Sequence, residues 1–415
     1  MPCSDRFTRV VLLAGAVLAA ACSHDGRGPT EPVRAWTGAE LQVAAASSSF
    51  GLGLLRDVAA SETTKPNVII SPLSASMALG MALNGAQGET YDAMRRTLGF
   101  GDLGNADVNA AYRGLIAQLH ARDGRVEFTL ANSMWYRQGF PVLPSFVDTV
   151  KNAFHAEIRG LDFADPAAPG IISQWAEQQT NGRIKDLIQQ IDPSEVMFLV
   201  NAVYFKAPWS TKFDKANTHT QPFLRLDGSN VNVPTMTREG TYRALANSEL
   251  KAAELLYGDS AFSIVLLAPA TGWSLDGVMA RLEPGRFDAL VDSMHARLVD
   301  LYLPKFTFDY ARQLNDPLKR MGMAVAFDQN HADFGRIADL STLGGNLYIS
   351  RVDQKAFVAT DESGTEAAAA TSVGIGVTSA PVPLVLRFDR PFVFVIRERS
   401  SGTILFAGRV GEPAA

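Results

Sequence analysis

Cysteine is almost missing from this chain of 415 residues, which contains only Cys3 and Cys22. Both lie within the first 22 residues, so the rest of the chain has no cysteine. That part therefore has no disulfide, no cysteine nucleophile and no cysteine-based metal site. Its stability must come from a hydrophobic core, which a body of about 375 residues can supply.

Recognisable catalytic motifs are missing as well. The sequence has no GxSxG elbow, no HExxH zinc pair, no phosphate-binding loop and no GxGxxG segment that opens a helix. We therefore expect neither an enzyme nor a cofactor or metal site. The six histidines show no ligand spacing and are interpreted as surface or core residues: His24, His120, His155, His219, His295 and His331.

The charge of the chain argues against nucleic-acid binding. The formal net charge is −5, the pI is about 5.8, and no long run of Lys or Arg occurs. The composition, 47% hydrophobic and 20% charged, is that of an ordinary globular protein.

The N-terminus has the pattern of an export signal. Arg6 and Arg9 precede an apolar run, residues 10–21, that is too short to span a membrane. We expect residues 1–21 to be a signal peptide that is cleaved after Ala21. Cys22 follows at once, which resembles a bacterial lipobox, although Ala19 stands where leucine is usual. The expectation is a lipid on Cys22 and a place in the cell envelope; without the lipid, the protein would be secreted.

The remaining chain predicts one α+β domain behind a flexible tether. Residues 22–35 are rich in Gly, Pro and polar side chains and are interpreted as the tether, and residues 36–415 as a single domain. Thr37 and Glu40 have capping-box spacing before a helical stretch, and Ser71 precedes a proline at the start of another. Helices are predicted at 41–58, 72–84, 90–98 and 106–119, and strands at 126–136, 196–205, 298–308, 347–360, 384–388, 392–396 and 404–410, with several short ones in 216–270.

One polar residue interrupts an apolar strand. Asn201 lies in the middle of VMFLVNAVYF, residues 196–205. If that strand is buried, the amide needs partners or costs on the order of 1–3 kcal/mol. Ser71 and Ser74 are the candidate partners. The alternative is an asparagine at a sheet edge that faces water.

Six segments, in order, resemble the serpin family over nearly the whole chain from about residue 41 to 413. Asn201 and Trp209, which the family places near the opening of its central sheet, are both present. The segments are NVIISPLSASMALGMALNGAQGET (67–90), LVNAVYFKAPWSTKF (199–213), LPKF (303–306), DESGTEAAAAT (361–371), DRPFVFVI (389–396) and ILFAGRV (404–410).

The resemblance implies three β-sheets, eight to nine helices and an exposed reactive-centre loop at about residues 361–383. In inhibitory members this loop is the bait of a serine protease, and after cleavage it inserts into the main sheet with the protease attached. The family usually has a histidine where this chain has Gln354. We expect Gln354 to join Ser71, Ser74 and Asn201 in a polar cluster beneath the sheet opening, with Trp209 in the breach region above it.

The loop sequence fits insertion as a strand. From residue 365 on, odd positions are small and then apolar, whereas even positions include Glu366, a serine and two glycines. Strand residues alternate between faces, so the odd set is predicted to face inward. The resemblance assigns the hinge of the loop to Glu362, Gly364, Thr365, Glu366, Ala367, Ala368, Ala369 and Ala370.

Counting from Gly364 by the family's spacing places the scissile bond between Thr378 and Ser379, with Val377 and Ala380 as alternatives. All four side chains are small, and no Arg or Lys is near, so we do not expect a trypsin-like target. We expect a monomeric inhibitor of elastase-like or subtilisin-like serine proteases. The alternative function is that of a non-inhibitory family member that acts as a binding protein.

Overall fold

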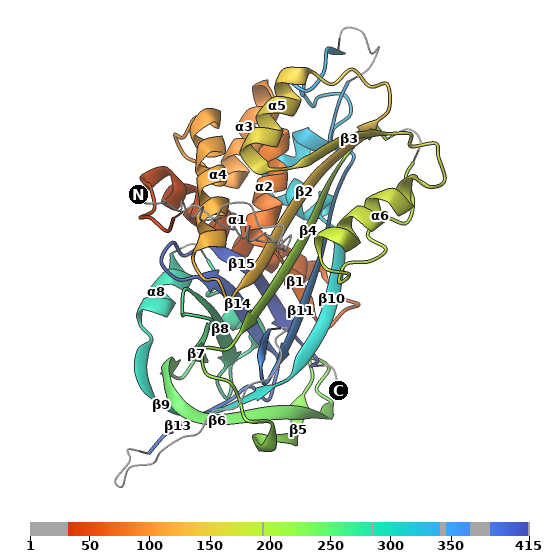
Figure 1. The fold of residues 1–415 in the computed structure, drawn as a ribbon. Coiled ribbons are helices and arrows are strands. Elements are labelled where there is room, and N and C mark those ends of the chain that lie inside the picture. The colour runs from red at the N-terminus through yellow and green to blue at the C-terminus, as the bar shows by residue number, and fades with distance from the viewer. Residues whose placement is uncertain (1–31, 193–194, 284, 341–345, 366–381, 414–415) are drawn as a thin grey trace, which may run out of the picture. The chain divides into compact units, whose positions relative to one another are not determined.

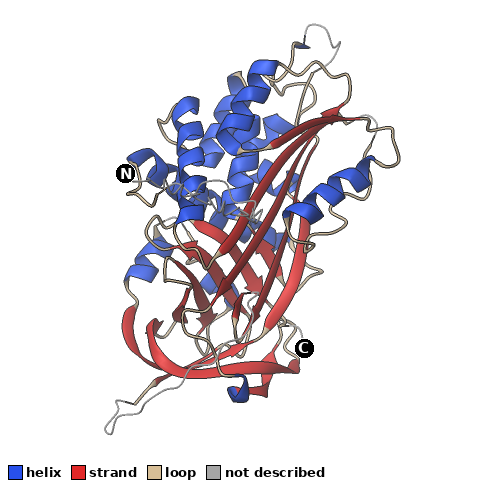
Figure 2. Ribbon diagram, in the orientation of Figure 1, coloured by secondary structure: helices blue, strands red, loops and turns tan. Residues whose placement is uncertain are grey.

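The computed structural model describes residues 32–192, 195–283, 285–340, 346–365 and 382–413. These residues belong to one compact unit, Glu31–Ala415. Among them, no helix combines the length and the apolar character that crossing a membrane requires. Helices and strands interleave along the chain, which confirms the α+β class (Figures 1 and 2).

At one end of this unit, α1, α3 and α5 pack against the buried α2, and α4 packs against α1 and α5 (Figure 1). The predicted capping box starts α1: Glu40 N donates to Thr37 Oγ1, and Thr37 N donates to the Glu40 carboxylate. All residues of α2 are buried, and its Ala, Ser and Gly allow close helix packing. The described helices are α1 (Gly38–Ser61), α2 (Pro72–Leu83), α3 (Gly88–Leu98), α4 (Asn105–Ala121), α5 (Pro144–Phe154), α6 (Ala168–Gln179), α7 (Leu275–Met279), α8 (Arg286–Asp292) and α9 (Asn315–Leu318), with short turns η1 (Lys215–Asn217), η2 (Lys319–Met323) and η3 (Ala324–Phe327).

The strands of the described residues form two hydrogen-bonded sheets. The larger has the order β1-β15-β14-β8-β7-β6-β9-β13, with β5 paired to β6, and the smaller has the order β10-β11-β12-β4-β2-β3. The strands are β1 (Val68–Ile70), β2 (Glu127–Arg137), β3 (Glu157–Leu161), β4 (Met197–Pro208), β5 (Thr218–Leu224), β6 (Asn230–Ala246), β7 (Leu250–Tyr257), β8 (Phe262–Pro269), β9 (His295–Pro304), β10 (Phe306–Gln313), β11 (Arg351–Asp361), β12 (Gly364–Thr365), β13 (Leu384–Arg387), β14 (Phe392–Glu398) and β15 (Ile404–Val410).

The long strand β6 explains why two sheets are counted where the resemblance implies three. One part of β6 pairs with β5 and β9, and its last residues pair with β7. Strands that would otherwise form separate sheets are thereby joined into one. The single strand expected at 298–308 is divided into β9 and β10, which belong to different sheets.

Strand β4 lies in the middle of the smaller sheet and is covered on both faces. On one face its side chains join the main core with α2, and on the other they pack with α6. Figure 1 shows α6 crossing this second face. A strand that is buried on both faces typically has a continuous apolar sequence, and residues 196–205 have this pattern.

Candidate functional site

Two strands of the smaller sheet are partly separated at one end. Strands β4 and β11 pair directly and in parallel from Phe198↔Arg351 to Val203↔Ala356. Beyond these pairs the two-residue strand β12 lies between them, antiparallel to both. The segment that follows β12 in the sequence is the predicted loop. The candidate site is therefore the end of the β4–β11 pairing, where Gly364 and Thr365, just before the predicted loop, already lie in the sheet.

Glycine is required at position 364 by close contact and by backbone conformation. Gly364 has a φ of +148°, which side-chain-bearing residues rarely adopt. A Cβ there would lie 2.1 Å from Ala207 O and 2.7 Å from Pro208 Cα. The preceding turn is closed by Asp361 Oδ1, which accepts hydrogen bonds from Ser363 N at 2.7 Å and Gly364 N at 3.3 Å.

Thr365 points inward, as the alternation predicts. Its side chain is buried, and its hydroxyl lies 2.7 Å from the Tyr257 hydroxyl and 3.4 Å from that of Thr360. Burial raises the pKa of Tyr257, so the phenol stays neutral and hydrogen-bonded.

Trp209 joins the turn before β12 to the end of β4. Its backbone N donates to Ser363 O at 2.9 Å, and its Nε1 donates to Asp361 O at 2.8 Å. The indole stacks on the Tyr257 ring, with centroids 4.6 Å apart and an interplanar angle of 9°. Trp209 therefore links the turn before β12 to the end of β4 and to Tyr257 on β7.

Glu362 is a buried carboxylate with two side-chain partners. Lys305 Nζ donates to it at 3.0 Å and Thr218 Oγ1 at 2.8 Å. Burial by itself raises the pKa of Glu362, but its hydrogen bonds to backbone, Lys305 and Thr218 outweigh burial, and the pKa lies below its ordinary value. The hinge is thereby held by an ion pair to Lys305, between β9 and β10, and by a hydrogen bond to Thr218 on β5.

The four predicted cluster residues meet beneath the β4–β11 pairing, as two adjoining groups. Gln354 exchanges two hydrogen bonds with the backbone of Ser71, accepting from its N at 3.0 Å and donating to its O at 3.1 Å. Ser74 Oγ donates to Asn201 Oδ1, and Asn201 Nδ2 donates back to Ser74 O at 3.2 Å. Asn201 is buried, which excludes the sheet-edge alternative. Because Gln354 and Asn201 are directly paired across the strands, the groups are neighbours.

Sequence reasoning missed a fifth member of this cluster. Asn132 on β2 lies opposite Asn201 and accepts a hydrogen bond from its Nδ2 at 2.5 Å. A polar residue inside the alternating segment 126–136 was the available signal. Lys305, within the LPKF motif, and Tyr257 were missed in the same way. Ser71 occupies the N-cap position of α2, but its Oγ accepts no hydrogen bond from the first turn of the helix and donates to Leu405 O at 2.7 Å.

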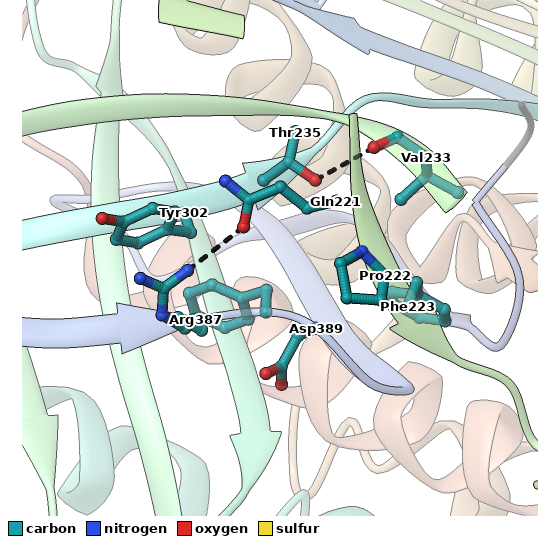
Figure 3. Close-up of a pocket in the computed structure, with 9 residues that line it drawn as sticks. Gln221, Pro222, Phe223, Val233, Thr235, Tyr302, Arg387 and Asp389 are labelled. Atoms are coloured by element: carbon teal, nitrogen blue, oxygen red, sulfur yellow. Dashed lines mark hydrogen bonds between the residues drawn. The ribbon is translucent and has the colours of Figure 1, made fainter. Parts of the chain in front are cut away.

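The chain returns to the larger sheet at β13, beyond the loop. β13 pairs in parallel with β9, and the Arg387 guanidinium lies 3.5 Å from the centroid of the Tyr302 ring. Arg387 Nη1 also donates to Gln221 Oε1 at 3.1 Å (Figure 3). Gln221, Tyr302 and Arg387 line a small pocket together with Asp389. Their contacts fix the second end of the loop.

The remaining predicted residues lie outside the described part of the chain. They are Cys22, Glu366, Ala367, Ala368, Ala369, Ala370, Val377, Thr378, Ser379 and Ala380. Within the segment predicted to be a tether, residues 32–35 contact α4: Gln118 Nε2 donates to Pro32 O at 3.1 Å, and Arg34 N donates to Gln118 Oε1 at 2.9 Å. No group of three His, Cys, Asp or Glu within the described ranges is arranged to hold a metal ion.

Comparison with known proteins agrees with this geometry. The family model described as Serpin (serine protease inhibitor) matches residues 45–413. An uncharacterized serpin-like protein of Thermococcus kodakarensis is 35% identical over 91% of this chain and 87% of its own length. Human neuroserpin is 31% identical over 84% of this chain and 86% of its own length.

Solved structures give the same result. The thermophilic serpin tengpin in its native state superposes with a TM-score of 0.81 and 30% identity, covering 92% of this chain and 96% of its own. Human thyroxine-binding globulin superposes with a TM-score of 0.83 and 27% identity, covering 91% and 100%. The match of the family model over most of the chain, the relatives and the fold together show that this protein belongs to the serpin family.

Proposed function

We propose that this protein inhibits serine proteases as a single-use substrate, whose cleaved loop inserts between β4 and β11. The observation that carries the proposal is β12: two residues of the loop already occupy the place where the rest would follow. The known function of most of the family supports the same conclusion, because the matching model is that of a serine protease inhibitor.

The pairing of β12 allows the strand to lengthen without a change of register. Thr365 opposes Ala207 on β4 and Thr360 on β11. Each residue added to an antiparallel strand moves one position back along both neighbours. Six positions further along the strand, residue 371 would therefore lie opposite Asn201 on β4 and Gln354 on β11. Asn201 and Gln354 already oppose each other, so both neighbours accept the same strand.

The residues that would enter suit the places they would take. Ala367 and Ala369 would lie inward beside Phe205, Val358 and their neighbours, where space is small because the core is closely packed. Thr371 would bring its hydroxyl into the polar cluster between Asn201 and Gln354. Glu366, on the outward face, would lie beside Lys206. Insertion therefore buries no unpaired charge.

Inhibition by this route needs no catalytic group from the serpin. We propose that cleavage occurs between Thr378 and Ser379, so that about 14 residues, or roughly 45 Å of strand, enter the sheet. Hydrolysis of the acyl-enzyme needs an aligned triad and oxyanion hole, and a displacement of about 1 Å can slow such a step roughly a hundredfold. Small residues at the bait bond favour an elastase-like or subtilisin-like target.

We also propose that the protein is exported and works outside the cytoplasm. The apolar run at residues 10–21 and Cys22 after the alanines support a cleaved signal and a lipid anchor. Mass spectrometry of the purified native protein measures both. A mature chain that begins at Cys22 with added lipid mass supports the anchor, whereas an intact leader contradicts export.

A denaturing gel tests the inhibitory mechanism directly. The protein is mixed with pancreatic elastase or with subtilisin, and a covalent complex that survives SDS is expected, together with loss of protease activity. A loop that is cut while the protease stays fully active would contradict inhibition and favour a binding function. Mass analysis of the released C-terminal fragment locates the scissile bond, and its first residue is expected to be Ser379.

A further inference from the structure

A cavity behind Trp209 is lined by three arginines and a single carboxylate. Arg238, Arg243 and Arg399 come from β6 and from the turn after β14, and Glu254 comes from β7. The cavity has a volume of about 110 Å³. Its rim includes Ser210 and Thr211, which are exposed, so that a small solute can reach it from solvent.

The carboxylate is already shared among several donors. Glu254 is buried and accepts from Arg243 Nη1 at 2.9 Å, from Arg399 Nε at 3.3 Å and from Ser263 Oγ at 2.8 Å. One negative charge therefore faces two guanidinium groups in direct contact. Among the described residues, the third guanidinium, that of Arg238, has no ion-pair partner and lies over the rings of Phe213 and Tyr242.

A fourth arginine lies close to Glu254 but does not line the cavity. The Arg397 side chain is 9% exposed, and its Nη2 lies 4.0 Å from Glu254 Oε1. Among the described residues, its buried Nε has no hydrogen-bond partner. Burial lowers the pKa of Arg397, and nearby Arg399 and Arg243 lower it further, whereas Glu254 and Asp288 act in the opposite direction. Burial of such a charge is costly unless an anion is near.

Two of the arginines keep donors for a ligand. Arg238 uses Nε for the Tyr242 hydroxyl at 2.7 Å and Nη1 for Lys212 O at 3.3 Å. Arg399 uses Nη1 for Ser260 O at 3.0 Å, besides the contact with Glu254. Within the described ranges, Nη2 of Arg238 and Nη2 of Arg399 have no acceptor. Both side chains are held in place by their other bonds, so these donors are preorganised.

We propose that this cavity binds one small oxyanion of the phosphate or sulfate class. Guanidinium groups match such oxygens in geometry and in charge, and the bound anion would compensate the charges of Arg238 and Arg399, whose side chains line the cavity. The site touches the hinge, because Trp209 forms its wall and holds Ser363 and Asp361. Occupation therefore stabilises the native position of β12.

Calorimetric titration of the full chain tests the site without any protease, so its outcome is independent of inhibition. Sodium phosphate and sodium sulfate are titrated separately at constant ionic strength, with chloride as the background salt. We expect one saturable site for either anion, at least tenfold weaker binding in Arg399→Gln, and the same loss in Arg238→Gln. The control Arg159→Gln removes an equal charge from an exposed position on β3 and should bind as the wild type does.

Thermal unfolding of the same variants separates binding from folding. In chloride, a cooperative transition shows that Arg399→Gln is folded. Added phosphate should raise the Tm of the wild type and of Arg159→Gln and leave that of Arg399→Gln unchanged. Absence of saturable binding in the wild type, or equal weakening in all three variants, would overturn the proposal.

Discussion

Replacement of Gly364 by alanine gives a direct test of how β12 is held in the sheet. The new Cβ would lie 2.1 Å from Ala207 O and 2.9 Å from Trp209 N, which are backbone atoms that cannot turn away. The backbone at φ +148° adds strain of about 1–3 kcal/mol. If β12 leaves the sheet, the Tyr257–Thr365 and Trp209–Ser363 hydrogen bonds are lost, at about 1 kcal/mol each. Leaving the sheet relieves the backbone strain, so the expected destabilisation is at least about 2 kcal/mol, the contribution of the two lost hydrogen bonds.

Gly139→Ala is the matched control for this change. Gly139 also has a positive φ, +82°, but nothing lies within 4 Å of the place of its Cβ. The substitution Gly139→Ala should therefore lower the free energy of unfolding only by the backbone strain. Urea unfolding, followed by tryptophan fluorescence, measures the midpoint of the first transition for both variants. Equal midpoints would refute the claim that close contact with β4, rather than backbone conformation alone, requires glycine at position 364.

Three further changes test other parts of the site. Thr365→Arg places a charge where the side chain is 1% exposed, so insertion should fail; the gel assay should show less than a tenth of the covalent complex while the loop is still cleaved, and full trapping would contradict the assigned hinge. Asn132→Ala removes the acceptor of Asn201 Nδ2 and should lower the free energy of unfolding by about 1–3 kcal/mol, measured in urea; an unchanged midpoint would show that Asn132 adds nothing to the cluster. Burial raises the pKa of Glu62, but hydrogen bonds, among them those from Thr64 and Tyr310, lower it to about 2. Since the folded pKa is depressed, the stability from Glu62 is complete above about pH 4.5 and disappears as the pH falls toward 2. In Glu62→Gln, the free energy of unfolding should therefore fall less between about pH 4.5 and pH 2 than in the wild type, by at most about 3 kcal/mol. An equal fall in both proteins would contradict this role of Glu62.

Much of the fold could be predicted because its signals are local. The capping box of Thr37 and Glu40, the proline after Ser71 and the apolar run around Asn201 each concern neighbouring residues, and the structure confirms the elements they predict. The division of residues 298–308 into two strands could not be predicted from such local signals. Both pieces have strand-like sequences, and only their pairing with β6 and β11 assigns them to different sheets.

The candidate site shows the same division. Ser71 and Ser74 could be proposed as partners of Asn201 because a buried amide must be satisfied, whereas Gln354 was assigned by the resemblance to the serpin family. The rule for buried amides applied to Asn132 as much as to Asn201. Lys305 lies close to no other hinge residue in the sequence, so its contact with Glu362, 57 positions away, had no local signal. The same holds for Tyr257, which bonds Thr365 across 108 positions.

The sequence by itself determined the order of the elements, the alternation of small residues in the loop and the absence of cysteine after residue 22. These properties depend on composition and on periods of two or 3.6 residues. Only the tertiary structure decided that β12 lies between β4 and β11, and that both neighbours accept one continuing register. That outcome depends on the pairing of strands from distant parts of the chain, since Ser71 and Gln354, which meet beneath the sheet, are 283 positions apart. Local preferences do not specify which distant strands will meet.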